Sequence, residues 1–229
     1  MARTRRTRML GALILGLGGC AILLGLGTWQ VQRHFWKQDL LAAMEARLEQ
    51  PPVALPRAPD PARDRFLAVA LSGTFDTAEI AVMASRRGDG PGYRIVTAFE
   101  TDDGRRILVD RGFIPAARRP DPRPPIPAQL IGNLHWPEEV DRFTPPPDVP
   151  AGLWFARDLP SMASALGAEP VLVVLRASDE ARPAASAMPL DTSGVPDNHA
   201  NYAVTWFLLA AAWAGMTVFL LWRIRQQPE

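Results

Sequence analysis

The sequence is poor in the residue types that build disulfides, metal clusters and most catalytic centres. Cys20 is its single cysteine, so no disulfide can form within the chain and no cysteine-based metal cluster is possible. The three histidines, His34, His135 and His199, do not pair at metal-site spacing. No Ser/His/Asp pattern, phosphate-binding glycine loop or recognisable pair of carboxylates is present. These absences disfavour a hydrolase, an NTPase or any other enzyme.

Lysine is also scarce, and the total charge is nearly balanced. Lys37 is the only lysine, and this arginine bias, together with the many alanines, glycines and prolines, indicates a GC-rich bacterial genome. The formal net charge is +1, so a nucleic-acid partner is not indicated. The length of 229 residues leaves room for one ordinary domain and membrane segments.

Charged residues are missing from two long stretches. None lies between Arg8 and Arg33, and a second uncharged run extends from Ala200 to Trp222. A helix needs roughly 20 apolar residues to cross the bilayer core, so we predict transmembrane helices at 9–29 and 200–222. The first run has two rival interpretations, a cleaved signal peptide and a lipoprotein signal at Cys20. No small-x-small cleavage site follows it and residues 21–26 stay apolar, so a true span is favoured.

The arginines next to the two spans predict the orientation. Arg3, Arg5, Arg6 and Arg8 precede the first span, and Arg223 and Arg225 follow the second. The positive-inside rule then places the ends, 1–8 and 223–229, in the cytoplasm of a bacterium, or in the matrix of a mitochondrion. The long middle segment is expected to be periplasmic, and the lipid bilayer of the inner membrane is an expected partner.

The middle segment predicts a helix followed by a β-rich domain. Residues 30–50 have helical apolar periodicity, 51–63 read as a proline-rich linker, 64–178 as the domain, and 179–199 as a return linker. Alternating residues predict strands near 67–75, 80–82, 93–99, 107–114, 130–136, 153–157 and 171–175, with a turn at 76–78 and a short helix at 160–166. The expected fold class is a membrane α+β protein whose mostly antiparallel domain is a small barrel or a sandwich.

His199 lies at the edge of the second span. On a helix it shares one face with Tyr202, Trp206 and Trp213, at spacings of three, four and seven residues. A neutral imidazole is a good axial ligand for haem iron, and an aromatic stripe could pack on the macrocycle. The pattern alone favours an interfacial aromatic belt with a capping histidine. Trp29, Gln30, Arg33 and Trp36 flank the first span, as interface anchors or as a rim facing His199.

Arg111 is the second candidate residue. Strict alternation places it on the face of Ile107, Val109 and Phe113, where an unpaired charge costs several kcal/mol. Either a carboxylate pairs with it, or Gly112 makes a bulge that turns it outward. A structural ion pair is favoured over binding of a ligand propionate or a partner, and Asp110 is assigned to the same structural or partner-binding group.

Four blocks of sequence carry a resemblance to a known family. The chain resembles the Surfeit locus protein 1 family, the assembly factors of haem–copper cytochrome c oxidase. The blocks occur in the family's order, and a weaker fifth is at 154–158. They are Gly27-Thr28-Trp29-Gln30-Val31-Gln32-Arg33 with Trp36-Lys37; Gly73-Thr74-Phe75 with Gly90-Pro91-Gly92-Tyr93; Ile107-Leu108-Val109-Asp110-Arg111-Gly112-Phe113-Ile114-Pro115; and Asn198-His199-Ala200-Asn201-Tyr202-Ala203-Val204-Thr205-Trp206-Phe207.

The resemblance implies a function without catalysis. Members of the family help to insert haem a into the main oxidase subunit, and bacterial members are thought to bind the haem. The implied partners are that catalytic subunit and the enzymes of haem a synthesis. His199 matches the family's candidate iron ligand. As a hypothesis, Tyr202, Trp206 and Trp29 would present aromatic faces to a transiently bound haem a, and Arg33 would meet its propionates.

Three rival functions stay open. The first is an interaction scaffold for oxidase assembly that binds no haem. The second is a membrane-anchored sensor, which is disfavoured because residues 1–8 and 223–229 are too short for a cytoplasmic output domain. The third is an envelope enzyme, which the missing catalytic residues disfavour.

Overall fold

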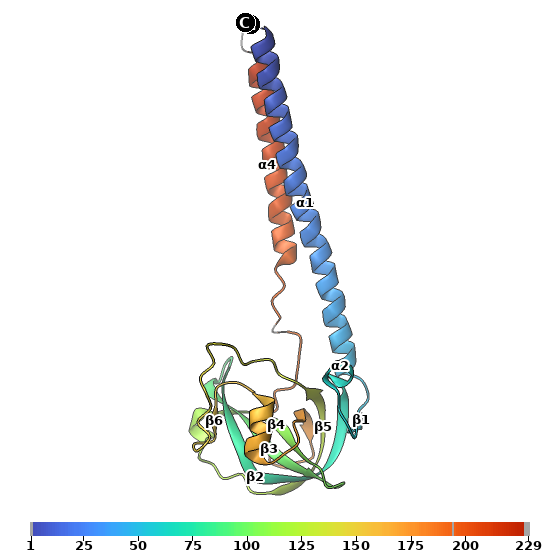
Figure 1. Cartoon of the computed structure of the whole chain (residues 1–229), viewed down its shortest axis with the longest axis vertical. Helices are drawn as coiled ribbons and strands as arrows, with labels where there is room; N and C mark the ends of the chain where they lie inside the picture. The colour runs from blue at the N-terminus through green and yellow to red at the C-terminus, as the bar shows by residue number, and fades with distance from the viewer. Residues whose placement is uncertain (1, 194, 227–229) are drawn as a thin grey trace. The chain divides into compact units, whose positions relative to one another are not determined.

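The structure is a computed structural model that describes residues 2–193 and 195–226. The chain divides into two compact units. One comprises Met1–Ala43 and Ser193–Glu229, and the other is Met44–Thr192. The first unit is helical and the second contains the sheet (Figure 1).

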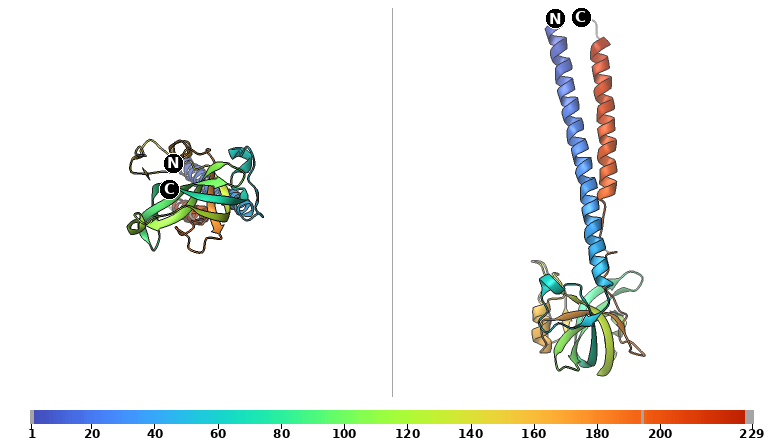
Figure 2. Two further views of the ribbon diagram at one scale, coloured as in Figure 1. Left: turned by 90° about the horizontal axis from the view of Figure 1, so that it is seen from below. Right: turned by 90° about the vertical axis from the view of Figure 1, so that its right-hand side faces the viewer.

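The helical unit is made by two long apolar helices, α1 and α4. α1 spans Ala2–Leu48 and continues without interruption from the predicted span into the predicted amphipathic helix. α4 spans His199–Gln226. Both helices are long and apolar enough to cross a membrane, judged by length and composition, and only 6% of the most apolar stretch of each is buried. They run side by side (Figure 2). They therefore fit the role of membrane anchors.

Glycines of α1 allow α4 to approach closely. A Cβ atom added at Gly16 would lie 2.1 Å from a Thr217 methyl carbon, and one at Gly19 would lie 2.2 Å from the Trp213 indole. The Trp213 Nε1–H also donates a 3.1 Å hydrogen bond to the Gly16 carbonyl. Small residues at a helix–helix contact are the usual means of packing in lipid, where no hydrophobic force draws helices together.

The second unit is one sheet with short helices in its connections. Its strands are β1 Val53–Ala54, β2 Ala68–Arg86, β3 Gly90–Thr101, β4 Arg106–Pro115, β5 Ile126–His135, β6 Leu153–Trp154 and β7 Leu172–Ser178. The short helices are α2 Pro61–Asp64, η1 Ala116–Arg118 and α3 Leu159–Leu166. α3 ends at Gly167, whose left-handed backbone (φ 60°) closes the helix.

The sheet is mostly antiparallel, as predicted, but short parallel pairs make it mixed, and it is not the closed barrel that was one of the two expected forms. β2 pairs antiparallel with β3 and β5, as do β3 with β4 and β5 with β7. β1, β6 and the β4–β7 pair add parallel neighbours. β2 pairs with β5 over residues 68–75 and with β3 over residues 73–75 and 79–86, so its two halves have different neighbours. The sheet is not a closed barrel.

The predicted turn at residues 76–78 is wrong. β2 continues through this segment as one strand of 19 residues, and its register against β3 shifts between Phe75 and Glu79. An irregularity of this kind inserts residues without ending the strand, and it increases the local bend. The alternation of apolar and polar residues is interrupted at this bulge, so the segment resembled a turn in the sequence.

β4 supplies core residues to both sides of the sheet. Ile107 and Val109 belong to a cluster that contains the ring pair of Phe75 and Phe99, whose centroids are 4.9 Å apart. Leu108 faces the opposite side and packs in the cluster beneath α3. The alternation of side chains along a strand makes this division possible. β4 is thus buried on both faces.

A bulge at Arg111 and Gly112 interrupts the pairing of β4 with β3. Ile95 pairs with Gly112 and Val96 pairs with Asp110, so Arg111 is the extra residue. Gly112 has φ of 107°, and a Cβ atom there would lie 2.1 Å from the Ser186 carbonyl oxygen. Only glycine fits this backbone and this close approach.

We expect Gly112→Ala to lower the free energy of unfolding by more than about 3 kcal/mol, because it combines backbone strain with a collision against the chain. Gly88→Ala is the matched control, since Gly88 also has positive φ (96°) but has open space at its Cβ position. That control should cost only about 1 kcal/mol. Urea unfolding of the full-length variants measures both values, and equal losses would contradict the account.

Candidate functional site

His199 is the first residue of α4, and Asp197 caps the helix. The backbone N–H of His199 donates a 3.2 Å hydrogen bond to Asp197 Oδ1. Aspartate is one of the preferred capping residues, because its carboxylate accepts from amides that have no partner within the helix. The cap sets the residue at which α4 begins. It therefore also sets which residues of α1 the His199 ring lies beside.

The His199 ring forms a hydrogen bond with a glutamine of α1. Its Nδ1 lies 2.7 Å from Gln30 Oε1. An amide oxygen only accepts hydrogen bonds, so Nδ1 donates this bond and carries a proton. This is the arrangement found behind metal-binding histidines, in which a carbonyl or carboxylate holds the other ring nitrogen. Among the described residues, no hydrogen bond engages the other ring nitrogen, Nε2.

The Asp197 carboxylate also joins the preceding segment to α1. Its Oδ2 accepts from His34 Nδ1 at 2.8 Å and from Gln38 Nε2 at 3.0 Å. Between these two residues of α1, Lys37 donates a 2.5 Å hydrogen bond to the Pro196 carbonyl. Partial burial opposes ionisation of Asp197. The hydrogen bonds from Gln38, the His199 backbone and His34 outweigh this effect and lower the pKa of the carboxyl group.

The other side chains predicted for this site do not touch His199 among the contacts of the described residues. Trp29 is 53% exposed and Tyr202 56% exposed, whereas Trp206 is partly buried. The Arg33 guanidinium lies over the Trp36 ring, 3.8 Å from its centroid. These groups form an aromatic and cationic surface around the two helices. The contact to His199 itself comes from Gln30.

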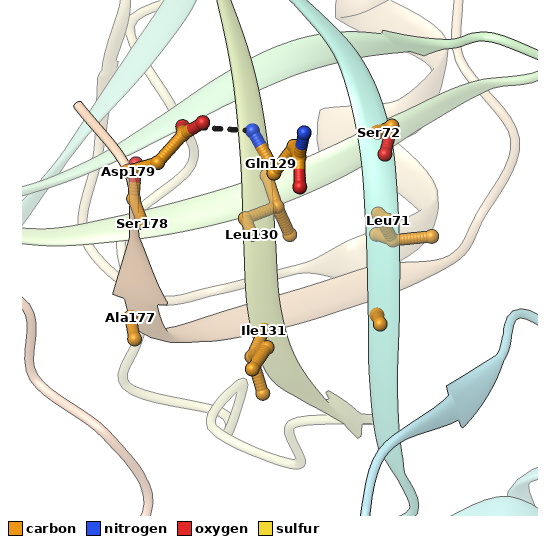
Figure 3. Close-up of a pocket in the computed structure, with 9 residues that line it drawn as sticks. Leu71, Ser72, Gln129, Leu130, Ile131, Ala177, Ser178 and Asp179 are labelled. Atoms are coloured by element: carbon orange, nitrogen blue, oxygen red, sulfur yellow. Dashed lines mark hydrogen bonds between the residues drawn. The ribbon is translucent and has the colours of Figure 1, made fainter.

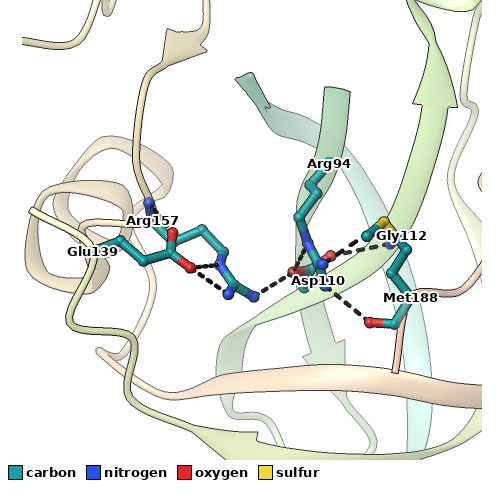
Figure 4. A network of polar contacts seen from close by, with 6 residues as sticks. All are labelled: Arg94, Asp110, Gly112, Glu139, Arg157 and Met188. Atoms are coloured by element: carbon teal, nitrogen blue, oxygen red, sulfur yellow. Dashed lines mark hydrogen bonds and ion pairs between the residues drawn. The ribbon is translucent and has the colours of Figure 1, made fainter. Parts of the chain in front are cut away.

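Asp110 is the centre of a buried charge network in the sheet unit (Figure 4). The residue is fully buried and accepts hydrogen bonds from Arg94 Nε at 2.7 Å, Arg157 Nη1 at 3.1 Å and the Gly112 amide at 3.0 Å. Burial disfavours the charged guanidinium of Arg157, but its bonds to Glu139 and the charge of Asp110 outweigh this effect and raise its pKa. Asp110 therefore has the contacts of a structural group.

Arg111 is buried beside this network. It is 2% exposed, donates from Nη2 to Glu180 Oε2 at 2.5 Å, and stacks on the Phe75 ring at 4.0 Å. The sequence offered a partner carboxylate and a bulge at Gly112 as alternatives, and both occur. The favoured alternative, a structural ion pair, is present with Glu180, and the bulge does not turn Arg111 outward. The bulge instead lets two successive charged residues of β4 find different buried partners.

A shallow hollow of about 440 Å³ lies on β2, β5 and β7 (Figure 3). Its walls include Leu71, Gln129 and Ile131. Its carboxylate, on Asp179, already accepts a 2.8 Å hydrogen bond from the backbone N–H of Gln129. None of the residues predicted to act in function lines this hollow.

Comparison with known proteins identifies the family. A sequence model of the SURF1 family matches residues 17–211. The chain belongs to the SURF1 family. It is 33% identical over 221 residues to a SURF1-like protein of Monosiga brevicollis, covering 87% of this chain and 83% of that protein. It is 32% identical to the Surfeit locus protein 1 of Homo sapiens and of Xenopus tropicalis, covering 82% of this chain and 70% and 68% of those proteins.

The sequence of this SURF1 protein placed Gln30 in a rim facing His199, but it assigned no role in the site to His34 or Gln38. Gln30, His34 and Gln38 recur every four residues on one face of α1, a polar stripe that could have been noticed. Asp197 was assigned no role, although its place before an apolar run is a capping signal. Glu180 was missed because its segment resembled a plain linker.

Replacing Gln30 should change the tautomer of His199. In the wild-type protein at about pH 8, we expect Nδ1 to carry the proton, because Gln30 accepts from it. Gln30→Leu removes the acceptor and should shift His199 toward the Nε2–H tautomer. Ring ¹⁵N chemical shifts of the histidine-labelled full chain measure the ratio.

The matched control is Gln32→Leu, since Gln32 is exposed on the same helix. This variant should keep the wild-type tautomer. A wild-type ring protonated on Nε2 would contradict the assigned contact.

Proposed function

We propose that this SURF1 protein is an assembly factor of cytochrome c oxidase that binds haem a through His199 and presents it to the catalytic subunit. Membership of a family known for oxidase assembly supports the general role. The observation that carries the haem-binding part is the 2.7 Å contact of Gln30 with His199 Nδ1, which leaves Nε2 as a free ligand atom.

The residues near His199 suit haem a as a cargo. An imidazole nitrogen is a common axial ligand of haem iron. The exposed rings of Trp29 and Tyr202 would provide flat surfaces for a hydrophobic macrocycle. Arg33 would pair with a propionate, although it must then share its guanidinium with Trp36. Haem itself would supply only an iron with an open coordination position, and the protein would hold and release it.

The neutral character of Gln30 suits a transient ligand. A carboxylate behind the imidazole would strengthen its basicity and hence its bond to iron, whereas an amide carbonyl does so less. The negative charge nearby, Asp197, is directed to His34, Gln38 and the helix cap, and touches only the backbone of His199. His199 would thus bind iron weakly enough to pass haem a on.

The proposed location is the bacterial inner membrane, with both termini in the cytoplasm and the sheet unit in the periplasm. The apolar surfaces of α1 and α4 support anchoring in a bilayer. The arginines at the terminal ends of the two helices support this orientation. The proposed partners are the oxidase catalytic subunit and the enzymes that make haem a, which would deliver it through the membrane.

An interaction scaffold without haem is the second candidate. Phe143 is 75% exposed in the loop before β6, with the Arg142 guanidinium 4.6 Å from its ring centroid. Aromatic residues and arginine are enriched in the surfaces through which proteins contact one another. This function needs the sheet unit and the two anchors but not His199.

Optical spectra of the purified full chain, co-expressed with the enzymes of haem a synthesis, distinguish the two functions. We expect the wild type to carry haem a, and His199→Ala to lose it or to show a shifted Soret band. His135→Gln is the control, because His135 lies in the sheet unit stacked on Phe66, and it should retain the haem.

A wild-type protein that purifies colourless and cannot be loaded with haem would refute the carrier function. The scaffold function would then take its place, provided that His199→Ala still supports assembly of active oxidase in cells.

A further inference from the structure

A cluster of arginines surrounds a small cavity in the sheet unit. The cavity has a volume of about 230 Å³ and lies where the β4 bulge, the β4–β5 connection and the segment after β7 meet. Its charged lining residues are Arg111, Arg118, Arg123, Arg182, Asp121 and Glu180. Neither the helical unit nor the proposed haem ligand contributes to it.

One positive charge at this cavity has no carboxylate partner among the described residues. Arg118 pairs with Asp121 at 2.9 Å, and Arg123 makes a two-pronged contact with Glu79. Arg111 pairs with Glu180. Arg182 is exposed and has no hydrogen bond or ion pair to any residue that the structure describes. Four arginines thus face three carboxylates, and the surplus charge is at Arg182.

Arg111, which lines the same cavity, has an unused hydrogen-bond donor. Its Nε is buried and has no hydrogen-bond partner among the described residues, while its Nη2 is held by Glu180. The Phe75 ring covers one face of the guanidinium. Buried N–H groups almost always have an acceptor, so an unpaired one beside a cavity points to a ligand that supplies it.

We propose that this cavity binds a carboxylate, which accepts hydrogen bonds from Arg111 and pairs with Arg182. A single surplus charge matches one carboxylate better than a phosphate, which carries a charge of about −1.5 to −2. The planar fork of a guanidinium also matches the two carboxylate oxygens. Pro122, Pro124 and Pro183 line the cavity and would contact a short apolar body behind the carboxylate. The site is independent of haem binding.

Titration of the full chain in lipid nanodiscs with sodium butyrate tests the proposal. Chloride keeps the ionic strength constant, and the arginine Nε–H signals in ¹H,¹⁵N spectra report binding. We expect a saturable shift of the Arg111 signal in the millimolar range. Arg182→Gln should weaken binding about tenfold, as expected for the loss of one charge-assisted contact.

Arg87→Gln is the matched control, because Arg87 is exposed at the β2–β3 turn, away from the cavity. It should bind butyrate as the wild type does. Equal weakening in both variants would overturn the proposal, because it would indicate non-specific screening. So would the absence of saturation, or tighter binding of inorganic phosphate than of butyrate.

A blocked peptide with one glutamate, titrated in the same way, identifies the source of the carboxylate. Binding of the peptide supports the site with the acidic side chain of a partner protein as its ligand. Binding of butyrate alone supports the site with a free small carboxylate.

Discussion

The arrangement of the helical unit depends on the hydrogen bonds that the Asp197 carboxylate accepts. One of its oxygens caps α4 at His199, and the other accepts from His34 and Gln38 of α1. A single side chain thereby sets where α4 starts and which level of α1 it faces. Gln30 lies one turn before His34, so this register brings its amide to the His199 ring. The free Nε2 is a consequence of that register.

In the sheet unit, the main constraint is the burial of charged side chains. Asp110 and Arg111 are consecutive, and both are almost fully buried on a strand with apolar residues on each face. Removing one partner of a buried ion pair typically costs about 3–5 kcal/mol. Asp110 forms ion pairs with both Arg94 and Arg157, and Arg111 forms an ion pair with Glu180 in the segment after β7. These pairs fasten long, proline-rich connections to the sheet.

Much of this structure could be predicted from local patterns. Uncharged stretches predicted α1 and α4, and alternation predicted most of the strands, because hydrophobic periodicity follows directly from local geometry. The continuity of β2, its change of partner, and the parallel β4–β7 pair could not be predicted, since they depend on contacts between distant segments. For the same reason, the motif identified His199, but its hydrogen bond to Gln30 depends on the register of two helices and could not be predicted. The ion pair of Glu180 could not be predicted because it depends on the fold of a segment that resembled a linker.

Chemical rescue tests directly the proposal that His199 Nε2 ligates the iron of haem a. Replacement of His199 by glycine leaves a space where the ring was, and added imidazole can occupy that space. We expect the full chain with His199→Gly to lose its haem a spectrum and to regain a wild-type spectrum when imidazole is supplied. A variant that keeps the wild-type spectrum without imidazole, or one that imidazole does not restore, would contradict the claim.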